Sequence, residues 1–221
     1  MIGALLDKAP DDRVQVLVLG AHGDDIEIGC GGTILELAAW YSNLAVHWVV
    51  LTSNAPRAQE ANDCARQFLR GVPESTIVVE RFRDGYLPYE GGRIKDFFER
   101  LKTEISPDVI FTHYRDDWHQ DHRLVSELTW NTWRDHLILE YEIPKYDPDI
   151  GSPNLFVHLS DATAHAKVEY LMDGYPSQAT RRWFTPDTFY GLMRLRGVAA
   201  QAERYAEGFY CRKLVLGRSS K

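Results

Sequence analysis

The chain has 221 residues, of which 44% are hydrophobic and 26% are charged, so its composition is that of a globular protein and gives no sign of intrinsic disorder. This length suits a single α/β domain, which we expect to span residues 1–221. The formal net charge of −7 gives no general attraction to nucleic acid or anionic lipid, and no apolar run is long enough for stable membrane insertion.

Strand-like and helix-like segments alternate from the N-terminus onwards. Segments rich in apolar and β-branched residues predict strands at 14–21, 45–53, 76–82 and 108–113. Segments with helical periodicity predict helices at 32–42, 56–69, 92–105 and 121–137. This alternation predicts an α/β fold with a mainly parallel sheet that is covered on both faces.

The pattern changes after residue 137. Three prolines and two aspartates predict a loop at 142–153, which a strand at 154–160 follows. Asp161 resembles the N-cap of a helix that continues through Met172, a long helix is expected at 187–206, and a strand at 207–216 closes the chain.

The cysteine pattern indicates a reducing compartment. Cys30, Cys64 and Cys211 are odd in number and widely spaced, which argues against a disulfide framework. Residues 1–12 contain acids and a proline and lack the apolar core of a signal peptide. We therefore expect a cytoplasmic protein.

Two clusters of histidine and aspartate follow predicted strands. His22, Asp24 and Asp25 come directly after the first strand, and the second cluster, Asp116-Asp117-Trp118-His119-Gln120-Asp121-His122, comes about a hundred residues later. Open α/β sheets place their sites at the carboxyl ends of parallel strands, so the two clusters are expected to meet.

The residue types in these clusters predict a metal site. His22, Asp25 and His122 together provide two imidazoles and one carboxylate, which suits zinc with a position left open for water, and Fe²⁺ is the alternative. Zinc would acidify that water and polarise a carbonyl group. Asp24 could then exchange protons with the water and the leaving group. A protonated His119 could stabilise an oxyanion, with Asp121 or Asp116 orienting its ring.

These residues resemble the LmbE-like, or PIG-L, family of zinc-dependent de-N-acetylases. The family's first signature, Ala-His-Pro-Asp-Asp-x-Glu, is found here as Ala21-His22-Gly23-Asp24-Asp25-Ile26-Glu27, and His-x-Asp-His is found as His119-Gln120-Asp121-His122. The resemblance extends from about residue 13 to residue 125. It departs at Gly23, which replaces the family proline, so the loop that carries the ligands is expected to be less preorganised.

The resemblance implies a fold, a reaction and a role for each matching residue. The fold is a Rossmann-like three-layer sandwich, and the reaction is hydrolysis of an N-acetyl or related N-acyl group on an amino sugar such as N-acetylglucosamine or a glycoconjugate. The implied roles are His22, Asp25 and His122 as metal ligands, Asp24 as general base, and His119 with its partner Asp121 at the oxyanion.

Several residues near these clusters allow two interpretations each. Asn54 and Arg57 follow the second strand and are candidates for substrate binding. For Arg57, the sequence supports a surface charge on a helix nearly as well as substrate binding. Glu27 is either a group that orients a ligand, or else a helix cap or solvated acid in the first helical turn. The glycines at 29, 31 and 32 are expected in a turn with positive φ, and His113 is expected to be buried with its hydrogen bonds satisfied.

Two other functions compete with the hydrolase hypothesis. A nucleotide- or cofactor-binding Rossmann domain is favoured by the glycines after the first strand, although their spacing does not fit GxGxxG and two carboxylates would repel a pyrophosphate. A non-catalytic metal-binding or scaffold protein is favoured only by the departure at Gly23. The sugar conjugate is not determined by the sequence, and a homo-oligomer is left open.

Overall fold

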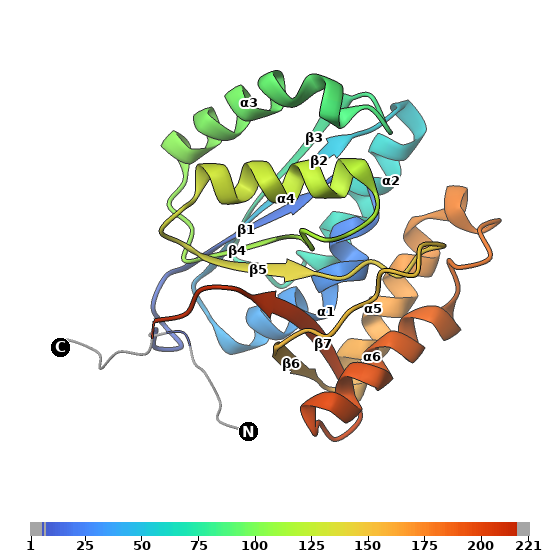
Figure 1. The fold of residues 1–221 in the computed structure, drawn as a ribbon. Helices are drawn as coiled ribbons and strands as arrows, with labels where there is room; N and C mark the ends of the chain where they lie inside the picture. Colours follow the sequence, from blue (N-terminus) through green and yellow to red (C-terminus); the bar gives the residue numbers. More distant parts are fainter. Residues whose placement is uncertain (1–5, 7, 216–221) are drawn as a thin grey trace.

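The computed structural model describes residue 6 and residues 8–215. Its sheet has seven strands in the order β3-β2-β1-β4-β5-β7-β6 (Figure 1). The strands are β1 (Val14–Gly20), β2 (Leu44–Thr52), β3 (Glu74–Phe82), β4 (Val109–His113), β5 (Leu137–Tyr141), β6 (Leu155–Leu159) and β7 (Tyr205–Cys211). The first five are parallel, and β7 runs antiparallel to both β5 and β6. The three-layer α/β fold with a mainly parallel sheet is therefore confirmed.

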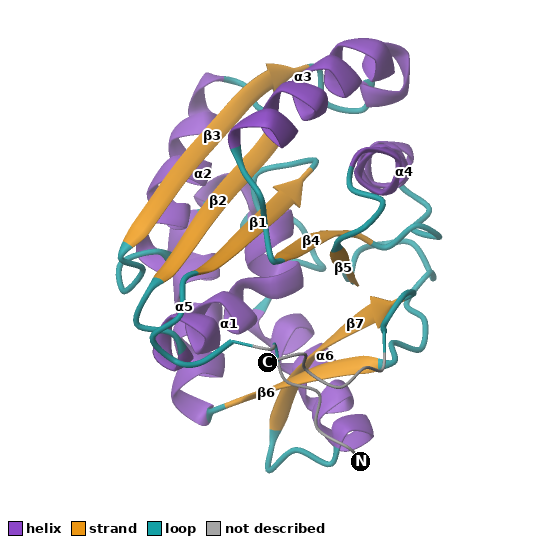
Figure 2. Cartoon of the chain, turned by 90° about the vertical axis from the view of Figure 1, so that its left-hand side faces the viewer, coloured by secondary structure: helices purple, strands orange, loops and turns teal. Residues whose placement is uncertain are grey.

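Helices cover both faces of the sheet (Figure 2). The α-helices are α1 (Asp25–Trp40), α2 (Ala55–Phe68), α3 (Gly91–Glu104), α4 (Gln120–Thr132), α5 (Asp161–Gly174) and α6 (Pro186–Ala200), and short 3₁₀ helices lie at η1 (Leu87–Glu90) and η2 (Pro176–Gln178). None of the described helices combines the length and the apolar composition that a bilayer span requires.

The alternation of side chains along the buried strands builds two cores. Val14, Val16 and Val18 face the layer that contains α1, α2, α5 and α6, whereas Leu17 and Leu19 face α3 and α4. Successive side chains of a strand point to opposite faces, so a strand that is apolar on both faces is buried between two helical layers. Strand β1 is therefore buried between the two helical layers.

Helix α1 begins seven residues earlier than the segment predicted at 32–42, and the glycines lie within it instead of forming a turn. A Cβ at Gly29 would lie 2.2 Å from the ring of Tyr141, and one at Gly31 would lie 2.6 Å from the ring of Phe68. Among the described glycines only Gly85 has a positive φ. The glycines are therefore required by close packing of α1, and the predicted turn is wrong.

Three predicted boundaries differ from the structure. The helix predicted at 121–137 ends at Thr132, and the apolar segment after it forms β5. The N-cap of α5 is Ser160, whose side chain accepts the N–H of Thr163, in place of Asp161. Helix α6 ends at Ala200, six residues before the predicted end at 206. The final strand begins at residue 205 and ends at residue 211. Residue 216 of the predicted strand lies outside the described residues.

Candidate metal centre

The predicted site residues lie at the carboxyl edge of the sheet, between two neighbouring strands. His22 and Asp25 follow the end of β1, and His119 and His122 follow the end of β4. The chain continues from β1 to β2 on one side and from β4 to β5 on the other, so the strand order reverses here. The connections leave the two strands in opposite directions and open a crevice at such a point, which is where α/β sheets bind ligands.

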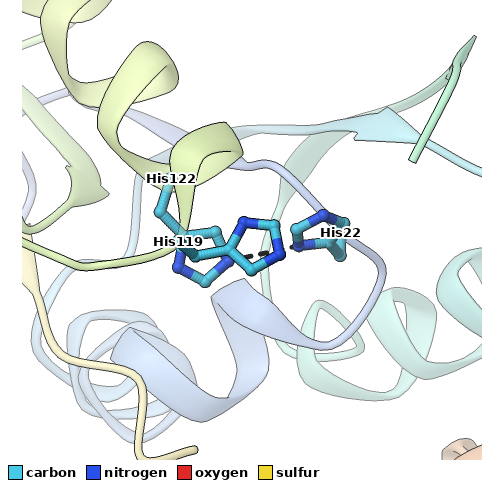
Figure 3. A group of neighbouring side chains, drawn as sticks. All are labelled: His22, His119 and His122. Carbon is cyan, nitrogen blue, oxygen red and sulfur yellow. Dashed lines mark hydrogen bonds between the residues drawn. The ribbon is translucent and has the colours of Figure 1, made fainter. Parts of the chain in front are cut away.

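The three predicted metal ligands converge, although His22 and His122 are 100 residues apart in the chain. Nδ1 of His22 lies 3.2 Å from Nε2 of His122 and 3.3 Å from Oδ2 of Asp25. Nε2 of His122 lies 3.5 Å from Oδ1 of Asp25. Tetrahedral ligands at about 2.0–2.1 Å from zinc are about 3.3 Å from one another, so the spacing of these atoms fits a zinc ion. Figure 3 shows the rings of His22, His119 and His122 side by side.

A carboxylate lies behind each of the two imidazoles. Nδ1 of His122 lies 2.9 Å from Oδ2 of Asp117, and Nε2 of His22 lies 3.3 Å from Oδ2 of Asp121. Asp84, which follows β3, brings a second carboxylate to 3.2 Å from Nε2 of His22. When the outer nitrogen of a neutral ring donates its proton to a carboxylate, the inner nitrogen presents a lone pair to the metal.

Sequence reasoning assigned no role to Asp117, the carboxylate behind His122. Asp117 is 3% exposed, and its Oδ2 also lies 3.1 Å from Nζ of Lys145. Lys145 reaches Oδ2 of Asp149 at 2.5 Å, and that oxygen accepts the N–H of Trp118 at 2.7 Å. Burial opposes ionisation of Asp117, but the hydrogen bond and charge of His122 and the charge of Lys145 lower its pKa. Its position in the second cluster was the one available signal.

The structure corrects the predicted role of Asp121 as the partner of the His119 ring. The Asp121 carboxylate accepts the backbone N–H groups of Gly85 at 2.7 Å and Leu87 at 3.1 Å, so it holds the loop after β3 as well as His22. Nδ1 of His119 instead accepts the backbone N–H of Asp121 at 3.2 Å, as the N-cap of α4. The alternative partner, Asp116, has a side chain that is 66% exposed and pairs with an arginine of the C-terminal segment.

Asp24, the predicted base, is buried next to the candidate ligands. It is 5% exposed, and its Oδ1 lies 3.3 Å from Nη2 of Arg57. Burial and the charge of Asp25 raise the pKa of Asp24 to about 7, whereas the charge of Arg57 opposes the rise. A carboxyl group with a pKa near neutral pH can both accept and release a proton during a reaction.

The two predicted substrate-binding residues occupy different positions. The guanidinium of Arg57 extends toward the centre, where it contacts Asp24 and lies 3.6 Å from Asp84, so Arg57 is more than a surface helix charge. Asn54 is the N-cap of α2, and its side-chain oxygen accepts the N–H of Arg57 at 3.1 Å. This hydrogen bond stabilises the start of the helix and accounts for Asn54 without a ligand.

His113 is buried beneath the centre, and only one of its nitrogens is hydrogen-bonded. Nε2 accepts the N–H of Ala21 at 2.9 Å and lies 3.2 Å from Oδ2 of Asp25. Nδ1 has no partner among the described residues, so the expectation of a fully satisfied histidine is wrong for that atom. Burial and the charge of His122 lower the pKa of His113 to about 4, which keeps the ring neutral.

Glu27 matches neither of its two expected roles. It is fully buried within α1, and its Oε1 accepts the O–H of Tyr175 at 2.5 Å. Burial raises the pKa of Glu27 to about 8. A carboxyl group in this environment is neutral over much of the physiological pH range. The hydrogen bond of Glu27 is made with Tyr175, at the end of α5, instead of with a metal ligand.

Gly23, at the position of the family proline, is buried against α2. A Cβ at residue 23 would lie 2.9 Å from Cβ of Ala61. Its φ is outside the left-handed region, so the backbone conformation does not itself require glycine. The tight contact between the ligand loop and α2 explains the residue, and it shows that this loop is fixed by packing.

Comparison with known proteins identifies relatives of this chain. The sequence profile of the family described as GlcNAc-PI de-N-acetylase (PIG-L) matches residues 17–133. The Escherichia coli (strain K12) protein named uncharacterized deacetylase YaiS is 29% identical over 150 residues, which cover 64% of this chain and 80% of that protein. The profile match includes both histidine-aspartate clusters.

Solved structures share the fold over nearly the whole chain. N,N′-diacetylchitobiose deacetylase from Pyrococcus horikoshii matches with a TM-score of 0.66 and 24% identity over 92% of this chain and 85% of that chain. GalB, the 4-carboxy-2-hydroxymuconate hydratase of Pseudomonas putida KT2440, matches with a TM-score of 0.71 and 16% identity over 94% and 100%. Because a hydratase also has this fold, the structural matches establish architecture only, and the family follows from the sequence. On that sequence match, which covers more than half of its length, the chain belongs to the PIG-L family of deacetylases.

Proposed function

We propose that this protein is a zinc-dependent hydrolase that removes an N-acetyl or related N-acyl group from an amino sugar or glycoconjugate. The observation that carries the proposal is the convergence of Nδ1 of His22, Nε2 of His122 and the carboxylate of Asp25 beside the buried Asp24. A structural zinc site needs four protein ligands and no adjacent acid, whereas a catalytic site leaves one position open. Fe²⁺ accepts the same donor set and is the alternative metal.

The donor set defines what the metal would supply. Held by His22, Asp25 and His122, a zinc ion would act as a Lewis acid toward a carbonyl oxygen and would make water acidic near neutral pH. Asp117 and Asp121 keep the two imidazoles in the tautomers that ligation needs.

Asp24 serves as the general base and then as the general acid of the reaction. Its carboxylate accepts a proton from the attacking water as the water oxygen bonds to the amide carbon. It then donates that proton to the amide nitrogen as the C–N bond breaks, so that acetate and a free amine are formed. Arg57, in contact with Oδ1 of Asp24, favours the ionised form that starts the cycle.

We expect His119 to stabilise the oxyanion as a neutral donor, and not as the protonated ring expected from the sequence. Because its Nδ1 accepts the N–H of Asp121, the ring proton lies on Nε2. Burial and the charges of His122 and His22 lower the pKa of His119, which favours this neutral form. A hydrogen-bond donor aimed at a developing negative charge lowers the barrier without needing a full positive charge.

The competing nucleotide-binding hypothesis loses its main support. The glycines that favoured it are inside α1, where Tyr141, Phe68 and Leu159 occupy the space above them. The N-terminus of the same helix carries Asp24 and Asp25, which would repel a phosphate.

The decisive experiment measures acetate release from a panel of N-acetylated sugars and glycoconjugates, with zinc or iron added back to chelated protein. Asp24→Asn should lower kcat by about a hundredfold to ten-thousandfold because it removes the proton acceptor. The variant should still bind one equivalent of zinc, since Asp24 is outside the ligand set. Near-normal turnover of Asp24→Asn would refute the assignment of the base, and inactivity of the wild type on every substrate would refute the proposed reaction.

A further inference from the structure

We propose that Lys145, in the loop between β5 and β6, is a positioning residue of the metal centre that acts through Asp117 and His122. This inference rests on the metal site of the proposed function, and it adds to that site a residue from outside the family-matched segment 17–133. Lys145 contacts the carboxylate behind His122 rather than a candidate ligand itself.

The Asp117 carboxylate is held by donors on both of its oxygens. Its Oδ1 accepts the backbone N–H of His119 at 2.7 Å, and its Oδ2 lies 2.9 Å from Nδ1 of His122 and 3.1 Å from Nζ of Lys145. The two histidines belong to the same short segment as Asp117, whereas Lys145 approaches from a different loop. Lys145 therefore fixes the carboxylate relative to the rest of the fold.

Lys145 lies between two buried carboxylates. Its Nζ is 2.5 Å from Oδ2 of Asp149 as well as 3.1 Å from Oδ2 of Asp117. The side chains of Lys145, Asp117 and Asp149 are 10%, 3% and 4% exposed, respectively. Buried charges of like sign repel each other strongly when no counter-charge lies between them. Without Lys145, this repulsion would push the Asp117 carboxylate away from His122.

The loop that carries Lys145 is braced at both ends by α6. Arg196 donates from Nε and Nη2 to the carboxylate of Glu142 at 2.8 and 2.6 Å, and from Nη2 to the carbonyl oxygen of Gly151 at 2.9 Å. Glu142 and Arg196 are both buried, and a bidentate pair of this kind fixes orientation as well as distance. Lys145 and Asp149 lie between these two anchors, so the C-terminal part of the fold places the ammonium group.

The charge and the position of Lys145 have opposite effects on metal binding. A positive charge near the site repels a cation, so charge alone predicts that removal of Lys145 tightens metal binding. Loss of position predicts weaker binding, because a displaced Asp117 no longer holds the His122 ring in the orientation that ligation needs. Position should dominate, since two carboxylates already neutralise the ammonium group, whereas His122 depends on Asp117 as the partner of its outer nitrogen.

The test measures the zinc affinity of the protein by competition with a chromophoric chelator. Lys145→Met should weaken zinc binding about tenfold, at the lower end of the effect of losing an outer carboxylate. In an Asp117→Asn background the same substitution should have no further effect, because the lysine acts through that carboxylate. Lys145→Met should also change the visible absorption spectrum of the Co²⁺-loaded protein, which reports the geometry of the ligands and which a loss of loop stability alone would leave in place.

Lys102→Met is the matched control, since Lys102 is exposed in the last turn of α3, and it should leave the zinc affinity unchanged. Lys145→Met/Asp149→Asn should recover part of the loss, because no second carboxylate then opposes Asp117. This double variant buries no like charges, so it carries the test if Lys145→Met does not fold. Its affinity should lie between those of the wild type and Asp117→Asn.

Unchanged or tighter zinc binding in Lys145→Met would overturn the proposal. An equal loss in the Asp117→Asn background, or wild-type affinity in the double variant, would do the same. A wild type that binds neither zinc nor Co²⁺ would refute the metal centre and the proposed function together with this inference. If the wild type binds zinc but releases acetate from no substrate, the proposed reaction fails alone, and the measured affinities still decide the role of Lys145.

Discussion

The two imidazoles of the candidate centre depend on acidic residues that touch no metal. Asp117 lies behind His122, and Asp121 with Asp84 lies behind His22. Removing such an outer carboxylate leaves the ligand in place but lets its ring rotate or change tautomer. At the scale of single residues, metal affinity should therefore respond to side chains outside the ligand set.

Asp117→Asn should weaken zinc binding about tenfold to a hundredfold, because the amide is a poorer acceptor for the Nδ1 proton of His122. The dissociation constant can be measured by competition with a chromophoric chelator. Asp116→Asn is the matched control, since the Asp116 side chain is 66% exposed and belongs to the same segment. Unchanged affinity in Asp117→Asn would show that His122 is oriented by other contacts.

At the scale of elements, the loop between β1 and α1 is held by its contact with α2. Gly23 lies so close to Ala61 that a side chain on residue 23 would place two carbon atoms 2.9 Å apart. Ala61 is 1% exposed and its Cβ cannot rotate away. The loop that presents His22 and Asp25 is thus positioned by packing between two helices, where the family uses proline.

Gly23→Ala should destabilise the zinc-free protein by about 1–3 kcal/mol through overpacking. Combination with Ala61→Gly should recover part of that loss, although glycine within α2 itself costs about 1 kcal/mol. Urea unfolding of the two single variants and the double variant measures the coupling as a double-mutant cycle. Strictly additive free energies would mean that the two residues do not compete for space.

At the scale of the whole molecule, the C-terminal part of the chain supplies hydrogen bonds to the backbone of α1. Lys167 of α5 and Glu207 of β7 form a buried ion pair at 2.6 Å. Glu207 accepts the N–H groups of Gly32 at 2.9 Å and Thr33 at 2.7 Å, and Lys167 donates to the carbonyl oxygen of Ile28 at 2.6 Å. These bonds reach the backbone in the middle of α1 from segments beyond the family-matched residues 17–133.

Glu207→Leu should lower the free energy of unfolding by about 3–5 kcal/mol, because it leaves Lys167 charged, buried and without its partner. Chemical denaturation followed by circular dichroism measures the change. Glu74→Gln serves as the control, since Glu74 pairs with Arg13 on the surface and its loss should leave the unfolding midpoint in place. A Glu207→Leu protein as stable as the control would contradict the view that this ion pair supports α1.

The same tertiary contacts explain which predictions from the sequence failed. Glycines 29, 31 and 32 were expected in a turn because glycine is common there, but Tyr141, Phe68 and Leu159 require their small size inside a helix. Asp121 was expected to partner His119 because the His-x-Asp-His signature implies it, but the loop that contains Gly85 binds Asp121. In each case the deciding partner is at least 30 residues away in the chain.

The sequence by itself determined the alternation of strands and helices, the two histidine-aspartate clusters and the choice of His22, Asp25 and His122, since apolar periodicity and short motifs are local properties. Only the tertiary structure decided that these three side chains meet and that β7 runs antiparallel to β5. It also decided that Asp84 contacts His22, that Asp117 contacts His122, and that Lys145 pairs with Asp117. The reason is physical: contacts between distant segments depend on strand order and on close packing of whole elements, which no short window of residues specifies.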